Sequence, residues 1–258
     1  MEKLYITSLQ NPLVKAWRAL KDAKARAEQG LFLAEGDHLT GEALTAHAAA
    51  ALLIAEQEQA RYQRHLDAAQ GQNLSVYVLS DRAMGAVCDA KTPQGVATLC
   101  RLPQLHQPLP ADKLKIAALD GVQDPGNVGT ILRTLDAFDF DGLLLLEGCA
   151  DPWSIKTVRS SMGAVFRRDV WCMRAAELPG LLERSGLPLY GTALRQDTED
   201  VRGVSLERCA IAIGSEGQGL SDAVLAMCRK TLKIPMSERC ESLNAAIAAA
   251  VLLWESYR

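Results

Sequence analysis

Patterns that mark metal sites, disulfide scaffolds and membrane segments are scarce in this sequence. Its seven cysteines are scattered, none forms a CxxC pair, and its four histidines include no HExxH. This argues against a zinc site or a disulfide framework, and we expect reduced, mostly buried thiols and no metal. The longest apolar run, residues 245–254, has about half the length that a membrane-spanning helix needs. The first residues contain no apolar signal-peptide core, so we expect a cytoplasmic protein.

A strong charge of either sign is also missing. The 28 Lys and Arg residues against 31 Asp and Glu give a net charge of −3, so no chain-wide positive excess announces a nucleic-acid partner. Basic residues nevertheless gather twice. Residues 1–30 hold six of them against three acidic residues: Lys3, Lys15, Arg18, Lys21, Lys24 and Arg26. The second cluster comprises Lys156, Arg159, Arg167, Arg168 and Arg174. Either cluster alone is equally well explained as a solvated face.

A proline-rich stretch divides the chain. Its length of 258 residues and hydrophobic fraction of 48% predict one large or two modest folded domains. Three prolines between positions 103 and 110 favour an extended tether, which separates residues 1–101 from residues 114–258 through a linker at 102–113. The first part predicts helices and strands in alternation: helices at 11–28, 36–48 and 57–68, and strands at 51–55, 75–79 and 95–100.

The second part has continuously apolar strands that alternate with helices, which indicates a mostly parallel sheet covered on both faces. The strands are predicted at 115–119, 142–147, 169–173, 187–194, 209–214 and 231–235. The helices are predicted at 127–138, 153–162, 176–184, 221–229 and 242–256. The apolar residues wrap the whole of the last helix, so we expect it to be buried in the core or in a subunit interface. The fold class is therefore α/β, in two domains.

Three strand-to-helix loops of the second part carry polar residues. In residues 120–134 the chain turns through Asp-Pro-Gly, and Asn127 is placed to cap the next helix, with Arg133 six residues further on. Asp136 is a candidate ion-pair partner for Arg133. In residues 213–221 three glycines surround Glu216 and permit close approach to a ligand, but the loop has neither the lysine of a P-loop nor a GxGxxG pattern.

The third loop runs from Ile234 to Asn244, where Ser242 is the expected helix cap and Asn244 lies inside the helix. Each loop alone is weak support for a site. Three such loops together are stronger, because ligands of parallel sheets gather beyond the carboxyl ends of the strands.

The three loops resemble the motifs of the SpoU/TrmH family of RNA 2′-O-ribose methyltransferases, within the SPOUT superfamily. The matching stretches read DPGNVGTILRT at 124–134, IGSEGQGLS at 213–221 and IPM…ESLNAAIAAA at 234–250. The resemblance covers residues 114–258 well. The N-terminal TSLQNPLVK…LFLAEGDHLTGEAL is more loosely similar to the small RNA substrate-binding domain that often precedes this catalytic domain.

The resemblance implies a fold that residue patterns alone would reject. The family's parallel sheet carries a deep trefoil knot, here at roughly 209–250, whereas knots are essentially absent from other folds. It implies a homodimer and S-adenosylmethionine as cofactor, held in the knot. Carried over residue by residue, the catalytic and substrate-positioning positions are Asn127, Arg133, Glu216, Ser242 and Asn244. The cofactor-binding positions are Thr192, Gly214, Gly217, Ile234, Met236 and Leu243.

Methyl transfer from a sulfonium to a ribose hydroxyl is an in-line displacement that needs no metal, so positioning supplies much of the rate. An arginine is nearly always protonated, and we therefore expect Arg133 to bind the phosphate of the target and to stabilise the developing alkoxide rather than to act as a base. The basic clusters become candidate RNA-binding surfaces, with Lys15, Lys21, Lys24, Lys156 and Arg159 tracking phosphates. Within this class of enzyme, ribosomal RNA is favoured over transfer RNA.

Two other interpretations stay open. A conventional, unknotted dinucleotide or methyl-donor domain would place the acid Glu147 on a ribose hydroxyl, 21 residues after Gly126. It leaves the second and third loops unexplained. A non-catalytic RNA-binding module that kept the fold is the other, and the complete set of catalytic positions argues against it.

Overall fold

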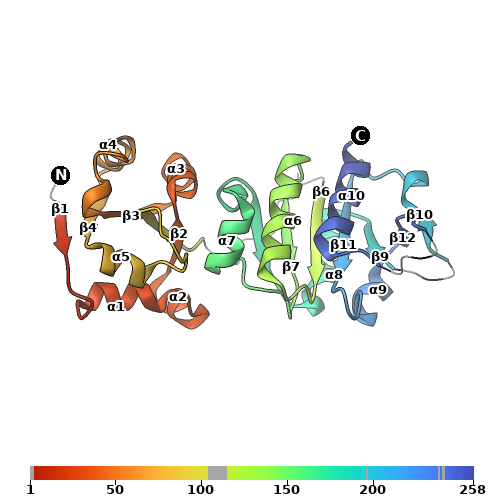
Figure 1. Cartoon of the computed structure of the whole chain (residues 1–258). Helices are drawn as coiled ribbons and strands as arrows, with labels where there is room; N and C mark the ends of the chain where they lie inside the picture. Colours follow the sequence, from red (N-terminus) through yellow and green to blue (C-terminus); the bar gives the residue numbers. More distant parts are fainter. Residues whose placement is uncertain (1–2, 104–114, 194, 196, 238, 240–241) are drawn as a thin grey trace. The chain divides into compact units, whose positions relative to one another are not determined.

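The computed structural model describes residues 3–103, 115–193, 195, 197–237, 239 and 242–258. These residues form two compact units, one made of Met1–Pro103 with Trp153–Phe166 and the other of Gln104–Pro152 with Arg167–Arg258 (Figure 1). The predicted linker at 102–113 lies almost wholly outside the described residues. The predicted boundaries at 1–101 and 114–258 stay a prediction.

The first unit is built on a five-stranded sheet in the order β1-β4-β3-β5-β2. Its strands are β1 (Lys3–Ile6), β2 (Leu31–Glu35), β3 (Ala49–Ala55), β4 (Ser75–Leu79) and β5 (Val96–Arg101). The strand β4 pairs in parallel with β1 and β3, whereas β5 runs antiparallel to β2 and β3. Its helices are α1 (Pro12–Ala19), α2 (Ala23–Gln29), α3 (Asp37–Thr45), α4 (Gln63–Gly71), α5 (Asp81–Val87) and α7 (Ile155–Ser161).

The predicted helix at 11–28 is wrong in one respect, because it is two helices. Asn11 caps α1 through Leu13 N–H, and Asp22 begins α2 by accepting from Lys24 N–H at 2.7 Å. The left-handed Gly30 (φ +65°) ends α2. A second cap inside the predicted helix thus breaks it, since a capping carboxylate competes with the helical backbone for its N–H groups. The strands β1 and β2, and the helix α5, were not expected.

The segment 153–166 belongs to the core of the first unit, although it follows a strand of the other unit in sequence. Ile155 of α7 packs in the cluster that contains Leu33 of β2. The ring of Phe32 lies 5.1 Å from the ring of Trp153 and 6.0 Å from that of Phe166, measured between centroids. Aromatic and aliphatic burial of this kind is the main stabilisation available to α7, which is only seven residues long.

The second unit contains the predicted parallel sheet, which has seven strands in the order β10-β12-β9-β11-β6-β7-β8. The strands are β6 (Lys115–Asp120), β7 (Gly142–Leu145), β8 (Asp169–Cys172), β9 (Leu189–Thr192), β10 (Glu199–Asp200), β11 (Cys209–Gly214) and β12 (Lys230–Lys233). Every pair is parallel. The helices are α6 (Pro125–Ala137), α8 (Leu178–Ser185), α9 (Asp222–Met227) and α10 (Ala245–Tyr257).

The central strand β11 is buried along its whole length, and β6 and β9 flank it. Its carboxyl end and that of β6 lie in register, with Gly214 opposite Asp120. The loops that follow these two strands therefore leave the sheet side by side. The trefoil knot, which strand order alone does not test, stays a prediction.

Burial explains why the cysteine side chains are expected to be unreactive. The six cysteines in the described part of the chain are all free thiols, and Cys240 lies outside it. Burial raises the pKa of Cys88 and of Cys209 to about 12. Such thiols stay protonated at neutral pH and are poor nucleophiles. No helix within the described ranges is long and apolar enough to cross a membrane.

Candidate active site

Glu216 is the point at which the three predicted loops meet. It follows β11, and its Oε1 accepts hydrogen bonds from the side-chain amide of Asn127, from Asn244 Nδ2 at 3.4 Å and from the backbone N–H of Ala245 at 3.4 Å. Asn244 Nδ2 also donates to Asn127 Oδ1 at 3.2 Å. Residues that are 89 and 117 positions apart in sequence are thus brought into one hydrogen-bonded cluster.

The expected cap of the last helix is wrong: Asn244, not Ser242, caps α10. Asn244 Oδ1 accepts from Ala246 N–H at 3.0 Å and from Ile247 N–H at 3.4 Å. The first helical residue is therefore Ala245, and its free N–H points to Glu216. The partial positive charge of a helix N-terminus stabilises a carboxylate placed there. Asn244 binds both partners of this contact, because its Oδ1 caps the helix while its Nδ2 donates to Glu216.

The expected cap of α6 is also corrected, since Asp124 takes this role. Asp124 Oδ1 accepts from the backbone N–H of Asn127 at 3.0 Å, and Pro125 occupies the first helical position, where its missing N–H costs nothing. The side chain of Asn127 is consequently available to Glu216. A local Asp-Pro-Gly turn has thus put the amide of Asn127 into the site.

Arg133 is exposed on α6, and its expected ion pair with Asp136 is absent. Asp136 instead accepts from Arg168 at 2.7 Å and from Arg167 at 2.8 Å. Burial opposes ionisation of Asp136, but the hydrogen bonds from these two arginines outweigh it and lower its pKa. Within the described ranges Arg133 makes no hydrogen bond or ion pair. Its guanidinium therefore keeps its five donors for a ligand.

The glycines of the second loop have different surroundings. A Cβ on Gly214 would lie 2.0 Å from the carbonyl carbon of Gly219, so the backbone passes too closely for any side chain. Ser215 and Gly219 exchange two backbone hydrogen bonds, of 3.2 and 2.9 Å, and Gly219 has φ +69°. A Cβ on Gly217 would meet nothing within 4 Å. The close backbone approach therefore requires glycine at 214, the left-handed φ favours glycine at 219, and position 217 is open.

The far end of the same loop is tied back to the sheet. Asp120, at the carboxyl end of β6, accepts from Ser221 N–H at 2.7 Å. Ser221 caps α9 as predicted, by accepting from Val224 N–H at 3.4 Å. The loop between β11 and α9 is thus anchored at both ends, which holds Glu216 in place.

A cavity of about 280 Å³ opens beside this cluster. Six predicted residues line it in addition to Glu216: Thr192, Gly214, Ile234, Met236, Ser242 and Leu243. Gly217 is not among its lining residues. Ala245, Ala248 and Leu252 of α10 also form part of its wall, and the apolar run that contains them was the signal in the sequence that could have indicated this.

The lining residues suit a ligand that has both a flat apolar part and polar or cationic groups. Aliphatic side chains from Ile213, Leu243 and Leu252 offer an apolar wall, backbone at Gly214 offers peptide groups without a side chain in the way, and Glu216 offers a carboxylate. S-adenosylmethionine has this combination of an adenine ring, hydroxyl groups and a sulfonium. The cavity therefore fits the cofactor that the motifs imply.

The expected RNA-binding residues have unequal surroundings. Lys15 is exposed on α1, and Lys24 on α2 forms a surface pair with Glu28 at 3.9 Å. Lys21 donates to the carbonyl of Cys88 at 3.1 Å. Lys156 is exposed on α7, whereas Arg159 is bound to the carboxylate of Glu35 at 2.8 Å.

The arginines of the second basic cluster already have acidic partners. Arg167 and Arg168 are paired with Asp136, and Arg174 lies 3.5 Å from Glu177. Arginines that already hold carboxylates offer less charge to phosphates than their number in the sequence indicates. Glu147 also has a structural partner, since it accepts from the N–H of Ala175 at 2.6 Å. This contact joins the residues after β7 to those after β8, so Glu147 has a structural role that does not require a ribose.

The parallel α/β fold and the site are those of a methyltransferase domain, and comparison with known proteins agrees. Residues 115–254 match the SpoU rRNA Methylase family, and residues 11–98 match the MRM3-like substrate binding domain. The 23S rRNA (guanosine(2553)-2′-O)-methyltransferase RlmP of Bacillus subtilis is 35% identical over 249 residues, which cover 96% of this chain and 97% of that protein.

Two solved structures extend the comparison. The AdoMet-bound rRNA methyltransferase from Sinorhizobium meliloti has a TM-score of 0.88 at 28% identity, covering 98% of this chain and 97% of its own. The SpoU methyltransferase AviRb from Streptomyces viridochromogenes, in complex with AdoMet, has a TM-score of 0.86 at 27% identity, covering 96% and 98%. This chain belongs to the SpoU rRNA methylase family. It is an RNA methyltransferase with S-adenosylmethionine as its methyl donor.

Proposed function

We propose that this enzyme transfers the methyl group of S-adenosylmethionine to a ribose 2′-hydroxyl of ribosomal RNA. The observation that carries the proposal is the convergence of Asn127 and Asn244 on Glu216, at the edge of a cavity that fits the donor. The full-length similarity to a 23S rRNA guanosine 2′-O-methyltransferase favours ribosomal over transfer RNA. A transfer RNA 2′-O-methyltransferase of the same family is the second candidate.

Bound S-adenosylmethionine supplies an electrophilic methyl group next to a positively charged sulfur. We assign its binding to backbone groups of Gly214, Ile234 and Leu243, with Thr192 and Met236 nearby. Gly217 lies outside the cavity lining, and a Cβ at this position would meet nothing within 4 Å, so we assign it no direct contact with the donor. Glu216, Ser242 and Asn244 shape this end of the cavity.

Arg133 is assigned to the RNA side of the reaction. Its guanidinium has no partner within the described part of the chain, and a planar fork of donors matches a phosphate well. In this role it binds the phosphate next to the target ribose and stabilises negative charge on the 2′-oxygen while the hydroxyl proton passes to solvent water, the bond from sulfur to the methyl group breaks and the bond from oxygen to the methyl group forms. Asn127 orients the ribose or Arg133, because its amide is already fixed by Glu216.

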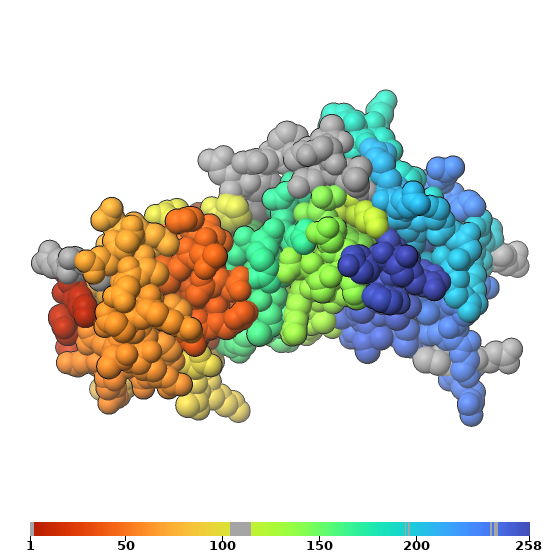
Figure 2. Space-filling model, turned by 90° about the horizontal axis from the view of Figure 1, so that it is seen from above, coloured from red at the N-terminus to blue at the C-terminus, as the bar shows by residue number. Residues whose placement is uncertain are grey.

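The homodimer implied by the resemblance has a candidate surface on α10. One face of this helix is buried against the sheet and α6, but Ile247, Trp254 and Tyr257 are 55, 49 and 54% exposed. The rings of Phe138, Trp254 and Tyr257 form a cluster with centroids 5.6 to 6.1 Å apart. Figure 2 shows α10, in dark blue, at the surface beside α6 in green. An exposed aromatic group of this kind is typical of a subunit interface.

The dimer is tested with Trp254→Asp, which places a charge in the centre of the aromatic cluster. We expect the molar mass from light scattering to fall from that of two chains to that of one. A wild-type protein that is already monomeric at micromolar concentration would contradict the assignment.

The activity is tested with purified enzyme, S-adenosylmethionine and deproteinised ribosomal RNA, with transfer RNA as the parallel substrate. Mass spectrometry of the digested nucleosides distinguishes 2′-O-methyl from base-methyl products, and mapping of the sites identifies the nucleotide. We expect a 2′-O-methylated nucleoside from ribosomal RNA. Methylation of transfer RNA alone would support the second candidate, and a base-methylated product would overturn the ribose assignment.

A further inference from the structure

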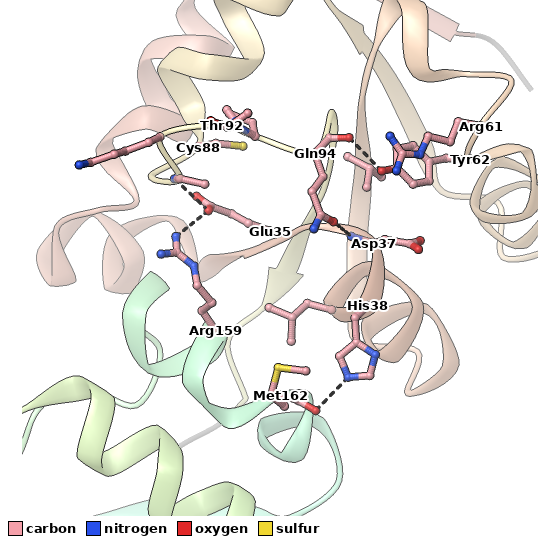
Figure 3. Close-up of a pocket in the computed structure, with 16 residues that line it drawn as sticks. Glu35, Asp37, His38, Arg61, Tyr62, Cys88, Thr92, Gln94, Arg159 and Met162 are labelled. Carbon is pink, nitrogen blue, oxygen red and sulfur yellow. Dashed lines mark hydrogen bonds and ion pairs between the residues drawn. The ribbon is translucent and has the colours of Figure 1, made fainter.

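The first unit contains a second cavity, of about 650 Å³, whose residues take no part in the methyl-transfer site. It lies between the loop at 88–95 and the start of α3, with Arg159 and Met162 at its margin (Figure 3). Figure 3 shows that Glu35, Gln94 and Arg159 reach it from three different elements. Residues 11–98 of the unit that contains this cavity match the MRM3-like substrate binding domain.

Both ends of the loop at 88–95 are held in place. At one end Glu35 accepts from the backbone N–H groups of Asp89 and Ala90, the latter at 3.3 Å. At the other, Gln94 Oε1 accepts from Asp37 N–H at 2.8 Å, and the Tyr62 hydroxyl donates to the carbonyl of Gln94 at 2.9 Å. The cavity is therefore preformed, so a ligand would not have to order this loop.

Two acidic side chains, Glu35 and Asp37, line the cavity, but both are paired with basic residues. Glu35, whose side chain is 6% exposed, is neutralised by Arg159 at 2.8 Å. Asp37 is bound by Arg64 and by His65, both at 2.6 Å, and these hydrogen bonds lower its pKa. Since both carboxylates are occupied, they offer little repulsion to an anion at the cavity mouth.

Two cations that line the cavity remain accessible. Lys91 is exposed and makes no hydrogen bond or ion pair within the described ranges. Arg61 forms a surface pair with Glu58 at 3.5 Å, and its guanidinium lies 5.3 Å from the ring centre of Tyr62. Exposed pairs of this kind are worth little, so Arg61 can exchange Glu58 for a phosphate.

The same cavity has an apolar side. Leu39, Pro93, Val96 and Met162 line it, and Met162 is 41% exposed. Gln94 uses its Oε1 to hold Asp37 N–H, which leaves its Nε2 as a donor for a further group. A cavity with an apolar wall, a free amide donor and accessible cations at its rim matches a nucleotide, because a base offers a flat face and polar edges and its backbone offers phosphates.

We propose that this cavity holds one unstacked nucleotide of the RNA substrate, with its base against Pro93 and Met162 and a neighbouring phosphate on Lys91 and Arg61. The inference rests on the proposed function in that the substrate is RNA. It adds a contact point in the first unit for a nucleotide other than the one that is methylated. Capture of an extruded base would make the enzyme select RNA with a looped or bulged nucleotide over a continuous duplex.

The experiment compares three single variants of the full-length enzyme in steady-state methylation of deproteinised ribosomal RNA. Lys91→Gln removes the free cation, and Thr92→Trp places a large ring at the cavity margin. Arg82→Gln is the matched control, because Arg82 is an exposed arginine of the same unit that does not line the cavity. Thermal unfolding confirms that each variant is folded, and titration with S-adenosylmethionine confirms an intact donor site.

We expect Lys91→Gln to raise KM for RNA by about tenfold with kcat nearly unchanged, since a lost charge-assisted contact weakens binding by about this factor. We expect a rise of similar size from Thr92→Trp, because its ring takes up space in the cavity. For Lys91→Gln the slope of log K for RNA binding against log salt concentration should become shallower by about 0.7, the value for one single-strand phosphate contact. Arg82→Gln should behave as the wild type.

The outcomes separate this inference from the proposed function. A wild-type enzyme that does not methylate RNA refutes the proposed function. An active wild type with unchanged KM in both cavity variants refutes the cavity alone. An equal loss in Arg82→Gln shows diffuse electrostatic binding and also refutes it. Binding of free nucleoside monophosphate that Thr92→Trp abolishes, while KM for RNA stays unchanged, would assign the cavity to a free nucleotide and overturn the proposal.

Discussion

The cavity beside Glu216 and the cavity beside Gln94 are built in opposite ways. The cavity beside Glu216 is lined by glycine backbone and aliphatic side chains, and its polar groups are held by one another. The cavity beside Gln94 is larger, and its acidic groups are neutralised while Lys91 stays free. The first suits a small ligand with an apolar ring, and the second suits part of a polyanion. The first cavity is thus shaped by close backbone approach at Gly214, whereas the character of the second depends on which of its charged side chains already have partners.

The largest expected effect comes from Gly214→Ala, compared with Gly217→Ala. A Cβ at 214 would lie 2.0 Å from the backbone of Gly219, and backbone cannot move aside as a flexible side chain does. We expect the free energy of unfolding to fall by about 3 kcal/mol or more and donor binding to be lost. At 217 a Cβ meets nothing, so a change below about 0.5 kcal/mol is expected.

Thermal or denaturant unfolding and calorimetric titration with S-adenosylmethionine measure both properties. Equal effects at the two positions would contradict the dependence of this cavity on close backbone approach.

The second effect concerns Arg133→Ala. Because its guanidinium supports no other described residue, we expect the stability to stay within about 0.5 kcal/mol of the wild type. Methyl transfer in a single turnover should slow by about a hundredfold or more, with donor affinity near normal, since the residue acts on the developing charge. Arg167→Ala is the control, because it removes an arginine that Asp136 already holds. Full single-turnover activity in Arg133→Ala would rule out its assigned role.

The third effect tests the first unit through Arg159→Gln. Glu35 is almost fully buried, so the loss of Arg159 leaves a carboxylate with only backbone donors, at a cost of about 1 to 3 kcal/mol. Arg174→Gln, at an exposed pair, should cost less than about 0.5 kcal/mol. Denaturant unfolding provides the measurement. If Arg159→Gln weakens RNA binding without loss of stability, Arg159 contacts an RNA phosphate, as predicted from the sequence, and its ion pair with Glu35 contributes little to folding.

The smallest effects are expected from single neutralisations on the first two helices. Lys15→Gln and Lys24→Gln should each reduce the salt dependence of RNA binding by about 0.7 in slope, with little change in stability. Lys21→Gln should also disturb the loop at 88–95, since Lys21 holds the carbonyl of Cys88. Fluorescence titration of labelled RNA at several salt concentrations tests this. An unchanged slope in all three variants would return these lysines to an ordinary solvated face.

Several site residues could be predicted because their signals are local. Gly214, Glu216 and Ser221 lie within one loop, and its spacing alone indicated a strand that turns into a capped helix. The apolar continuity of the strands predicted the parallel sheet. The wrong assignments are those in which two local candidates competed. Ser242 and Asn244 are both good caps, and Asn244 takes the position because Glu216 and Asn127 bind its other atom.

Charge was predicted least well. In sequence, Asp136 is three residues from Arg133 on one helix, which is the spacing of an ion pair. In the structure, arginines 31 and 32 residues away reach it instead. The basic segment around 156–174 likewise loses most of its free charge to carboxylates that are far away in sequence. A count of charges gives their number, but their availability depends on partners that only folding supplies.

The sequence by itself determined the parallel sheet of the second unit, the three loops and the family to which the chain belongs, because each of these depends on residues within about 15 positions of one another. Only the tertiary structure decided that α7 joins the core of the first unit and that Arg159 is held by Glu35. These contacts join residues that are more than 100 positions apart in sequence. Packing of the hydrophobic core brings such residues together, and local sequence patterns do not indicate which of them will meet.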